Sequence, residues 1–111
     1  MKITRLFDLL PHYKEVKPDQ QVALACKRDG KWINYSIDDY IEQVNYVSAG
    51  LLSLGVKKDD KIAIISSNRP EYNILDMGIM QIGAVPVPIY PTISESDYQY
   101  ILNHAEITYV F

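Results

Sequence analysis

The sequence has little of several features that mark particular classes of protein. Cys26 is its one cysteine, which excludes an internal disulfide and a zinc site made of several cysteines. A small buried thiol is the usual role of such a residue, and a reducing compartment suits it. No apolar run approaches the ~20 residues of a membrane-spanning helix. The first apolar run is interrupted by Asp8 and is too short for a signal peptide, so we expect a cytoplasmic protein.

Positive charge is also scarce. The chain has 11 lysines and arginines against 14 acidic residues, which gives a net charge of -3. Nucleic-acid binding calls for a basic face that neutralises phosphates. The basic pair at 57–58 is cancelled at once by the acidic pair at 59–60. We therefore expect no nucleic-acid partner.

Candidates for catalysis or metal binding are few. His12 and His104 stand far apart in the sequence, without a neighbouring nucleophile or ligand cluster, which is typical of solvated or structural histidines. The acidic pairs at 38–39 and 59–60 fit a helix start and a loop. Magnesium prefers carboxylates that converge with substrate phosphates. The sequence thus assigns no catalytic residue and no metal ligand to this segment.

Local signals predict a helix and a hairpin near the N-terminus. Thr4 can cap the helix, and we expect a break or a new turn at Pro11, which sits too deep for a helix start. Strands at 21–28 and 31–35 flank Asp29-Gly30, a pair that tolerates the positive φ angles of a tight hairpin turn. These signals together predict one β-hairpin.

A long helix follows and completes a first unit, residues 1–60. Ser36 caps the helix, and Gly55 ends it in a left-handed conformation. Its apolar residues recur at three- and four-residue steps. They predict a face that packs in the core, made of Ile37, Tyr40, Ile41, Val44, Val47, Leu51 and Leu54.

The pattern changes at residue 61. A strand at 61–66 is apolar without alternation, as expected when both faces are covered. The next helix begins near Asn68 with Pro70 in its first turn. Apolar residues lie nearly all round this helix, so we expect deep burial of Ile74, Leu75, Met77, Ile79, Met80 and Ile82.

A second strand at 85–89, a helix opened by Ser94 and Asp97, and a third strand at 108–111 complete a second unit, residues 61–111. Alternating strands and helices at these spacings imply a parallel sheet with right-handed crossovers. The sequence therefore predicts an α/β fold, in which an N-terminal β-hairpin and helix precede a parallel β-α-β-α-β unit.

Two details bear on the edges of that sheet. Pro86 and Pro88 are two residues apart, so their missing N–H groups lie along one edge, and we expect their strand to be hydrogen-bonded on one side only. The sequence stops at Phe111 inside an apolar strand, which suggests a truncated domain. Surfaces meant for missing neighbours then predict self-association.

One stretch is a candidate anion site. Residues 66–69 lie between a strand end and a helix N-terminus, where free amides and the helix dipole can hold an anion. Ligands also gather at the carboxyl ends of parallel strands. Arg69 is the candidate contact, and the alternative is simple capping by Ser67 or Asn68 with Arg69 solvated. Tyr90 follows a strand end and can line a cleft in a longer parent enzyme, although the core or a subdomain interface is the usual place of such a tyrosine.

Three blocks of the sequence carry a family resemblance that covers nearly the whole chain. Residues 32–40, WINYSIDDY, running into 49–56, resemble the opening block of the AMP-forming adenylating enzymes. Residues 61–72, KIAIISSNRPEY, are similar to the strand and helix that follow in that family. Residues 78–92, GIMQIGAVPVPIYPT, resemble the family's second block. The segments NRPEY and PIYPT lean toward the long-chain fatty acid–CoA ligases.

The resemblance implies a longer parent enzyme with a two-step reaction. A fatty acid carboxylate attacks ATP to give acyl-AMP and pyrophosphate, and the thiol of coenzyme A then displaces AMP. Cations, including Mg²⁺, would stabilise the charge on the phosphates. The family's phosphate loop, its Thr-Glu pair and its C-terminal lysine have no counterpart here. Residues 1–111 are thus expected to be the N-terminal portion of the adenylating domain, a scaffold without catalysis of its own.

Two alternatives stay open at this point. The chain can belong to another adenylating enzyme, such as an acyl-AMP ligase or a peptide-synthetase adenylation domain. It can also be a stand-alone α/β interaction or oligomerisation module. The reading frame beyond Phe111 separates these readings. The sequence also leaves open whether a parent enzyme associates peripherally with membranes.

Overall fold

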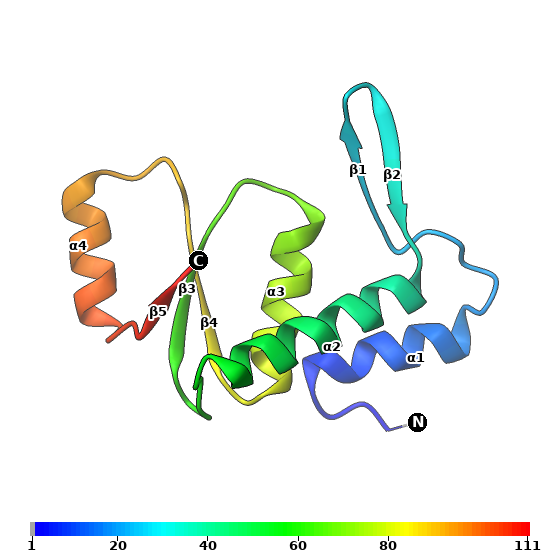
Figure 1. Ribbon diagram of the computed structural model, residues 1–111, viewed down its shortest axis with the longest axis horizontal. Helices are drawn as coiled ribbons and strands as arrows, with labels where there is room; N and C mark the ends of the chain where they lie inside the picture. Colours follow the sequence, from blue (N-terminus) through cyan, green and yellow to red (C-terminus); the bar gives the residue numbers. More distant parts are fainter. Residues whose placement is uncertain (1) are drawn as a thin grey trace.

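The computed structural model describes residues 2–111, and Met1, the first residue of the predicted unit 1–60, lies outside the described residues. The chain folds into a hairpin, a three-stranded sheet and the helices around them (Figure 1). In chain order the elements are η1 (Leu6–Asp8), α1 (Leu9–Val16), β1 (Leu24–Arg28), β2 (Lys31–Tyr35), α2 (Ile37–Ser53), β3 (Lys61–Ile65), α3 (Pro70–Gln81), β4 (Val85–Ile89), α4 (Glu95–His104) and β5 (Tyr109–Val110).

The sheet topology confirms the predicted fold class. β1 and β2 form the antiparallel hairpin, and its turn places Asp29 at φ 52° and Gly30 at φ 75°. The second sheet has the order β4-β3-β5, and both neighbours run parallel to β3. The chain is therefore α/β, with a hairpin and helix ahead of a parallel β-α-β-α-β unit.

Of the two outcomes expected at Pro11, the structure shows a new helical start just ahead of it and no break. The chain first makes the short 3-10 helix η1, so α1 begins only at Leu9 and Pro11 falls in its first turn. The N–H groups of a first turn have no partner within the helix, so a proline there costs no hydrogen bond. Thr4 does not act as the cap either. Its backbone N–H and hydroxyl instead donate to the Asp8 carboxylate, at 3.2 and 3.3 Å.

Helix α2 begins as the sequence predicts. The Ser36 hydroxyl oxygen accepts the backbone N–H of Asp39 at 3.0 Å, and the Asp39 carboxylate accepts the N–H of Ser36 at 3.0 Å. This reciprocal pair is a capping box, which satisfies two amides that have no partner within the helix. Hydrogen bonding from Ser36, chiefly from its backbone N–H, lowers the pKa of the Asp39 carboxyl group.

The end of α2 departs from the predicted stripe at one residue. Gly55 has φ 91°, and the N–H of Val56 reaches back to the carbonyl oxygen of Leu51 at 3.1 Å. This left-handed turn buries Val56 against Leu51. Leu54 was expected in the core, but 62% of it is exposed. The left-handed turn comes after Leu54, so the chain enters the core at Val56 and not at Leu54.

Helices α2 and α3 join the two apolar clusters of the core. One cluster lies between α2, α3 and the sheet and contains Leu51, Val56, Ile62, Ile64, Ile79 and Ala84. The other lies between α1, α2 and α3 and contains Leu10, Tyr40, Val44 and Ile74. Val47 packs against both clusters. The hairpin and the sheet are therefore held to one another through this helix pair.

Helix α3 is less buried than its sequence predicts. Ile74 and Ile79 are buried, whereas Leu75, Met77, Met80 and Ile82 are half-buried. The helix packs on α2 and on the sheet, and it also contacts η1 and the hairpin strand β1, so its apolar residues are shared among several neighbours and not enclosed by any one of them. The apolar residues on every side of α3 therefore led to a prediction of deeper burial than this helix has among residues 2–111.

The edge strand β4 behaves as its two prolines predict. Among residues 2–111 it pairs with β3 alone, in the register Ile62↔Pro86 and Ile64↔Pro88. The N–H of Val85 donates to the carbonyl oxygen of Asp60 at 2.8 Å, toward the β3 side. The side of β4 that carries the prolines is the open edge of the sheet.

Candidate functional site

The topology of the sheet opens a crevice between β3 and β4. The chain leaves β3 through α3 toward β4, and it leaves β4 through α4 toward β5, on the other side of β3. Right-handed crossovers in opposite directions place the two helices on opposite faces, as Figure 1 shows. The two loops therefore diverge at the carboxyl ends of neighbouring parallel strands, which is where ligands sit in open α/β sheets.

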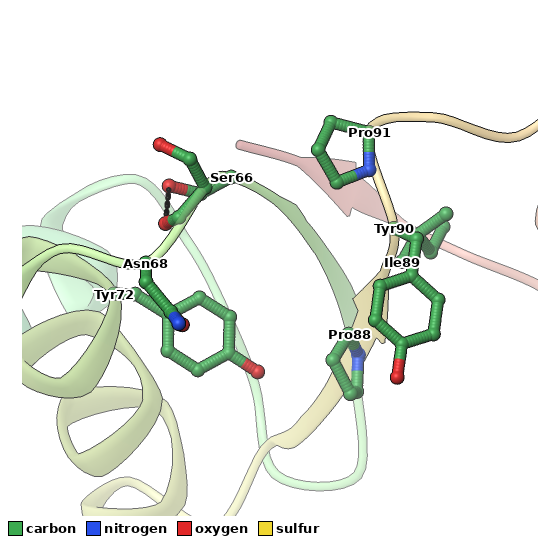
Figure 2. A pocket seen from close by; sticks show the side chains of 8 residues that line it. Ser66, Asn68, Tyr72, Pro88, Ile89, Tyr90 and Pro91 are labelled. Atoms are coloured by element: carbon green, nitrogen blue, oxygen red, sulfur yellow. Dashed lines mark hydrogen bonds between the residues drawn. The ribbon is translucent and has the colours of Figure 1, made fainter.

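A pocket of about 520 Å³ lies in this crevice. Its volume is in the range of small-molecule sites. Three segments meet there: the loop after β3, the first turn of α3, and the end of β4 with the loop that follows (Figure 2). The lining residues are Ser66, Ser67, Asn68, Tyr72, Pro88, Ile89, Tyr90 and Pro91.

Two tyrosines form opposite sides of the pocket. Figure 2 shows the ring of Tyr72, from α3, on one side and that of Tyr90, after β4, on the other. Burial raises the pKa of Tyr72, and the nearby charges of Asp76 and Tyr90 raise it further. Tyr72 thus presents a neutral hydroxyl at physiological pH. The carbonyl oxygen of Tyr90 accepts a hydrogen bond from the Tyr98 hydroxyl at 3.0 Å, which ties this loop to α4.

The loop after β3 presents polar groups to the pocket. The Ser66 hydroxyl donates to the carbonyl oxygen of Ser67 at 2.9 Å, a bond drawn in Figure 2. Neither Ser67 nor Asn68 caps α3, because the helix begins one residue later and Arg69 holds the N-cap position without a side-chain cap. The predicted capping by Ser67 or Asn68 is therefore wrong.

Arg69 lies beside the pocket and points its charge elsewhere. Its guanidinium donates to the Glu71 carboxylate, and the Arg28 guanidinium, from the hairpin, donates to the same carboxylate. Burial alone would raise the pKa of Glu71, but the hydrogen bonds from Arg69 and Arg28 outweigh it and hold that pKa below its ordinary value. Arg69 is not among the residues that line the pocket. Its predicted role as an anion contact stays a prediction.

Comparison with protein families decides the identity of this arrangement. The family described as "AMP-binding enzyme" matches residues 11–111. The chain belongs to this family. Membership accounts for the three sequence blocks that resemble the adenylating enzymes.

Curated relatives place this AMP-binding chain near fatty acyl ligases. It is 37% identical over 83 residues to the long-chain-fatty-acid–CoA ligase FadD15 of Mycobacterium bovis, which covers 75% of the chain and 14% of that protein. It is 39% identical over 87 residues to fatty acyl-CoA synthetase A of Dictyostelium discoideum, which covers 78% of the chain and 13% of that protein. The chain thus spans about one seventh of the length of these relatives.

A solved structure supports the fold of the AMP-binding chain. The N-terminal subdomain of NpsA from Klebsiella oxytoca, in complex with 3-hydroxyanthranilyl-AMSN, matches with a TM-score of 0.80 and 26% identity. The match covers 97% of this chain and 26% of that one. The hairpin, the helix pair and the parallel sheet are therefore arranged as in the N-terminal subdomain of an adenylating enzyme.

The pocket lining of the AMP-binding chain does not by itself fit a triphosphate or a magnesium ion. Its side chains are hydroxyls, an amide, two aromatic rings, two prolines and an aliphatic group, with no carboxylate and no cation. No group of three potential metal ligands gathers among residues 2–111. The lining instead suits an uncharged or mainly apolar part of a ligand, with hydrogen bonds from hydroxyl and amide groups.

The other candidate residues lie outside this pocket. His104 stacks on Tyr100 with ring centroids 5.3 Å apart, and Asp38 pairs with Lys14 at 2.7 Å. His12 lies on α1. No helix formed by residues 2–111 has the length and hydropathy to cross a bilayer. Of the site residues, the sequence pointed to Tyr90 and the loop at 66–68, and it missed Tyr72.

Proposed function

We propose that this chain forms one wall of the substrate site of an AMP-forming fatty acid–CoA ligase that acts on long-chain fatty acids. The observation that carries the proposal is the pocket at the carboxyl ends of β3 and β4 in a member of the AMP-binding family. Identities of 37% and 39% to two fatty acyl ligases favour this substrate class over other adenylated acids.

The proposed reaction divides between this chain and the remainder of a longer enzyme. A fatty acid carboxylate attacks the α-phosphorus of ATP and releases pyrophosphate, and the thiol of coenzyme A then attacks the acyl carbon and releases AMP. Both steps develop charge that needs cations. Because the pocket lining carries no charge, we assign ATP phosphates and Mg²⁺ to residues beyond this segment. The residues of this chain would position uncharged parts of the substrates and exclude water.

The predicted units 1–60 and 61–111 take different parts in this proposal. The second unit carries the pocket, and the first unit packs on it through the contact between α2 and α3. This arrangement makes the whole segment a scaffold that has no catalytic group of its own. We also propose that such an enzyme acts in the cytoplasm.

A second candidate function has one observation in its favour. The match to NpsA, whose structure holds 3-hydroxyanthranilyl-AMSN, favours an adenylating enzyme of another substrate class. The third reading is a stand-alone interaction module. Sequencing the gene beyond the codon for Phe111 separates the three readings. Adenylating motifs followed by a fatty acyl ligase pattern support the first, and a stop codon favours the third.

A hybrid enzyme tests the proposal directly. The matching segment of fatty acyl-CoA synthetase A from Dictyostelium is replaced by residues 11–111, and acyl-CoA formation from palmitate, ATP and coenzyme A is followed by mass spectrometry. We expect an active hybrid and an inactive 111-residue chain. Tyr72→Ala should lower kcat/KM of the hybrid by tenfold or more, since the ring forms one side of the pocket. Tyr46→Ala is the control, because Tyr46 is exposed on α2.

Two results would contradict the proposal. Thioester synthesis by the 111-residue chain alone would show that the catalytic groups lie within it. A folded hybrid that adenylates amino acids or aryl acids and ignores palmitate would support the second candidate. For Arg69, equal affinity of the wild-type chain and Arg69→Ala for ATP would end the idea of an anion contact.

A further inference from the structure

At the start of α3, residues that line the pocket alternate in the sequence with residues that carry charge. Asn68 and Tyr72 line the pocket. Arg69 and Glu71 lie between them and form an ion pair with one another. The backbone N–H of Tyr72 donates to the carbonyl oxygen of Arg69 at 3.1 Å. A displacement of this first turn would therefore move Tyr72 together with the two charged residues.

The first turn of α3 lacks the usual side-chain cap. Arg69 holds the N-cap position, and its side chain forms no capping bond to the helix. Pro70 follows and has no N–H to donate. A carboxylate is favoured in this turn by the helix dipole, and Glu71 supplies it. The position of the turn thus depends strongly on the groups that hold Glu71.

The hairpin supplies one of those groups. Arg28, the last residue of β1, donates Nη2–H to Oε1 of Glu71, and Arg69 donates Nε–H to Oε2, so each carboxylate oxygen accepts one guanidinium. The bond to Glu71 raises the pKa of the Arg28 guanidinium. Charge-assisted bonds of this kind are stronger than neutral ones. Among residues 2–111, Arg28 with Glu71 is the one ion pair that joins the hairpin to α3.

We propose that Arg28 is a positioning residue of the substrate pocket. It holds Glu71, and through Glu71 it fixes the first turn of α3 in the place that brings Tyr72 to the pocket wall. Arg28 is not among the lining residues, so it acts only through α3. Helix α3 contacts both β1 and the sheet and lies between them in Figure 1. The role in substrate binding rests on the proposed function, whereas the fixing of the turn does not.

The exposure of the ion pair determines where its effect should be found. The side chains of Arg28 and Glu71 are 45% and 39% exposed, and pairs exposed to this degree contribute little to global stability. Local opening of a helix end requires much less free energy than global unfolding. We therefore expect the loss of Arg28 to loosen the first turn of α3 and to leave the packed core unchanged.

Hydrogen exchange of the 111-residue chain tests this without any substrate. Exchange of the backbone amides of residues 66–72 is followed by mass spectrometry at short labelling times, in wild type and in Arg28→Ala. An exposed ion pair corresponds to about a two- to fivefold change in an opening equilibrium, so exchange in this segment should become faster by about that factor. Amides of α2 serve as the internal reference and should be unchanged.

Lys31→Ala is the matched control. Lys31 stands opposite Arg28 in the hairpin register and is exposed, and it forms no ion pair with any residue in the range 2–111. Its removal takes one positive charge from the same face and should leave exchange unchanged. Arg28→Lys should restore part of the protection, because an ammonium can still bind one carboxylate oxygen. Raised salt should narrow the difference between wild type and Arg28→Ala.

The hybrid enzyme that carries residues 11–111 tests the role in substrate binding. Arg28→Ala should raise KM for palmitate by about two- to fivefold and leave kcat nearly unchanged, because a displaced Tyr72 weakens binding of substrate and transition state alike. A merely structural loss would instead remove active enzyme, which lowers kcat at constant KM. Arg28→Lys should recover part of the KM, and Lys31→Ala should change neither constant.

Three outcomes would overturn the proposal. Equal exchange of residues 66–72 in wild type and Arg28→Ala would show that the hairpin does not hold this turn. Equal acceleration of the α2 amides would make Arg28 a residue of general stability. An active hybrid with an unchanged KM would remove Arg28 from substrate binding. A hybrid that ignores palmitate would count against the proposed function alone, since the exchange experiment decides the fixing of the turn independently.

Discussion

Gly78 is the residue on which the packing of α2 against α3 depends. A Cβ atom at this position would lie 2.7 Å from Cγ1 of Val47 and 3.1 Å from its Cβ. These distances are shorter than side chains in a packed core can adopt without displacement. The close approach also lets the Ser48 hydroxyl donate to the carbonyl oxygen of Gly78 at 2.9 Å. Glycine is required here by contact between helices, and not by its own backbone conformation.

Replacing Gly78 with alanine should therefore destabilise the protein. The added methyl group overpacks the crossing, and we expect a loss of about 1–3 kcal/mol in the free energy of unfolding. Urea unfolding followed by the helical circular dichroism signal measures the loss. Gly50→Ala is the matched control, because Gly50 lies in α2 and a Cβ atom added there would have no other atom within 4 Å. Alanine should stabilise the helix there by up to about 1 kcal/mol, and destabilisation by both changes alike would contradict the argument.

At the scale of elements, the start of the first helices depends on one carboxylate. The Arg5 guanidinium donates to Asp8, and the backbone N–H groups of Thr4 and Arg5 do the same. These bonds lower the pKa of Asp8 from 3.8 to about 2, against the opposing effect of burial. The ionised carboxylate thus holds the 3-10 helix η1 and the first turn of α1 in place.

The lowered pKa of Asp8 makes a prediction about acid. A carboxyl group whose pKa is lower in the folded state stabilises the fold fully above its unfolded pKa, and the stabilisation is lost as pH falls. Unfolding free energy should therefore decrease between about pH 4 and about pH 2. Asp8→Asn should be less stable than wild type at neutral pH and should show a flatter profile over that range. Urea unfolding at a series of pH values, with Asp19→Asn as the control, measures both, and parallel profiles for wild type and Asp8→Asn would contradict the assignment.

Elements determined by local chemistry could be predicted from the sequence. The hairpin followed from the positive φ angles that Asp29-Gly30 adopts in its turn, and the start of α2 followed from Ser36, whose capping bonds reach only three positions. The continuous helix through Pro11 could not be predicted, since it depends on the 3-10 turn that precedes it. The exposure of Leu54 likewise depends on which residue the turn at the end of α2 directs inward.

The same distinction applies to the candidate site. Tyr90 follows a strand end, and this position was enough to suggest that it lines a cleft, though not which one. Tyr72 depends on which flank of α3 faces the ends of the strands, and the apolar pattern all round that helix gave no direction. The pairing of Arg69 with Glu71 is local, but the second arginine on Glu71, Arg28, lies 43 residues away. Such a contact depends on how the hairpin packs on α3.

At the scale of the whole molecule, β5 is a second edge of the three-stranded sheet. It pairs with β3 alone among residues 2–111, and Val110 and Phe111 are 52% and 45% exposed. An apolar edge strand of this kind can pair with another chain. We therefore predict that the 111-residue chain self-associates as its concentration rises.

Light scattering measures the predicted self-association. Val110→Lys should return the chain toward a monomer, because a charged side chain at an edge strand opposes pairing. Leu52→Lys is the control, since Leu52 is similarly exposed, at 58%, on α2. A wild-type chain that stays monomeric at high concentration would contradict the prediction. Equal effects of the two lysines would point to general solubility.

The two prolines of β4 give the sheet a direction in which it can be extended. A strand that approached this side would meet no amide hydrogen at Pro86 or at Pro88, so it would find acceptors without the donors that alternate with them. The flank formed by β5 has no such gap. Any additional strand, whether it comes from more polypeptide or from a second molecule, is therefore steered to β5. A stretch of five residues in this way decides on which side this domain can be enlarged.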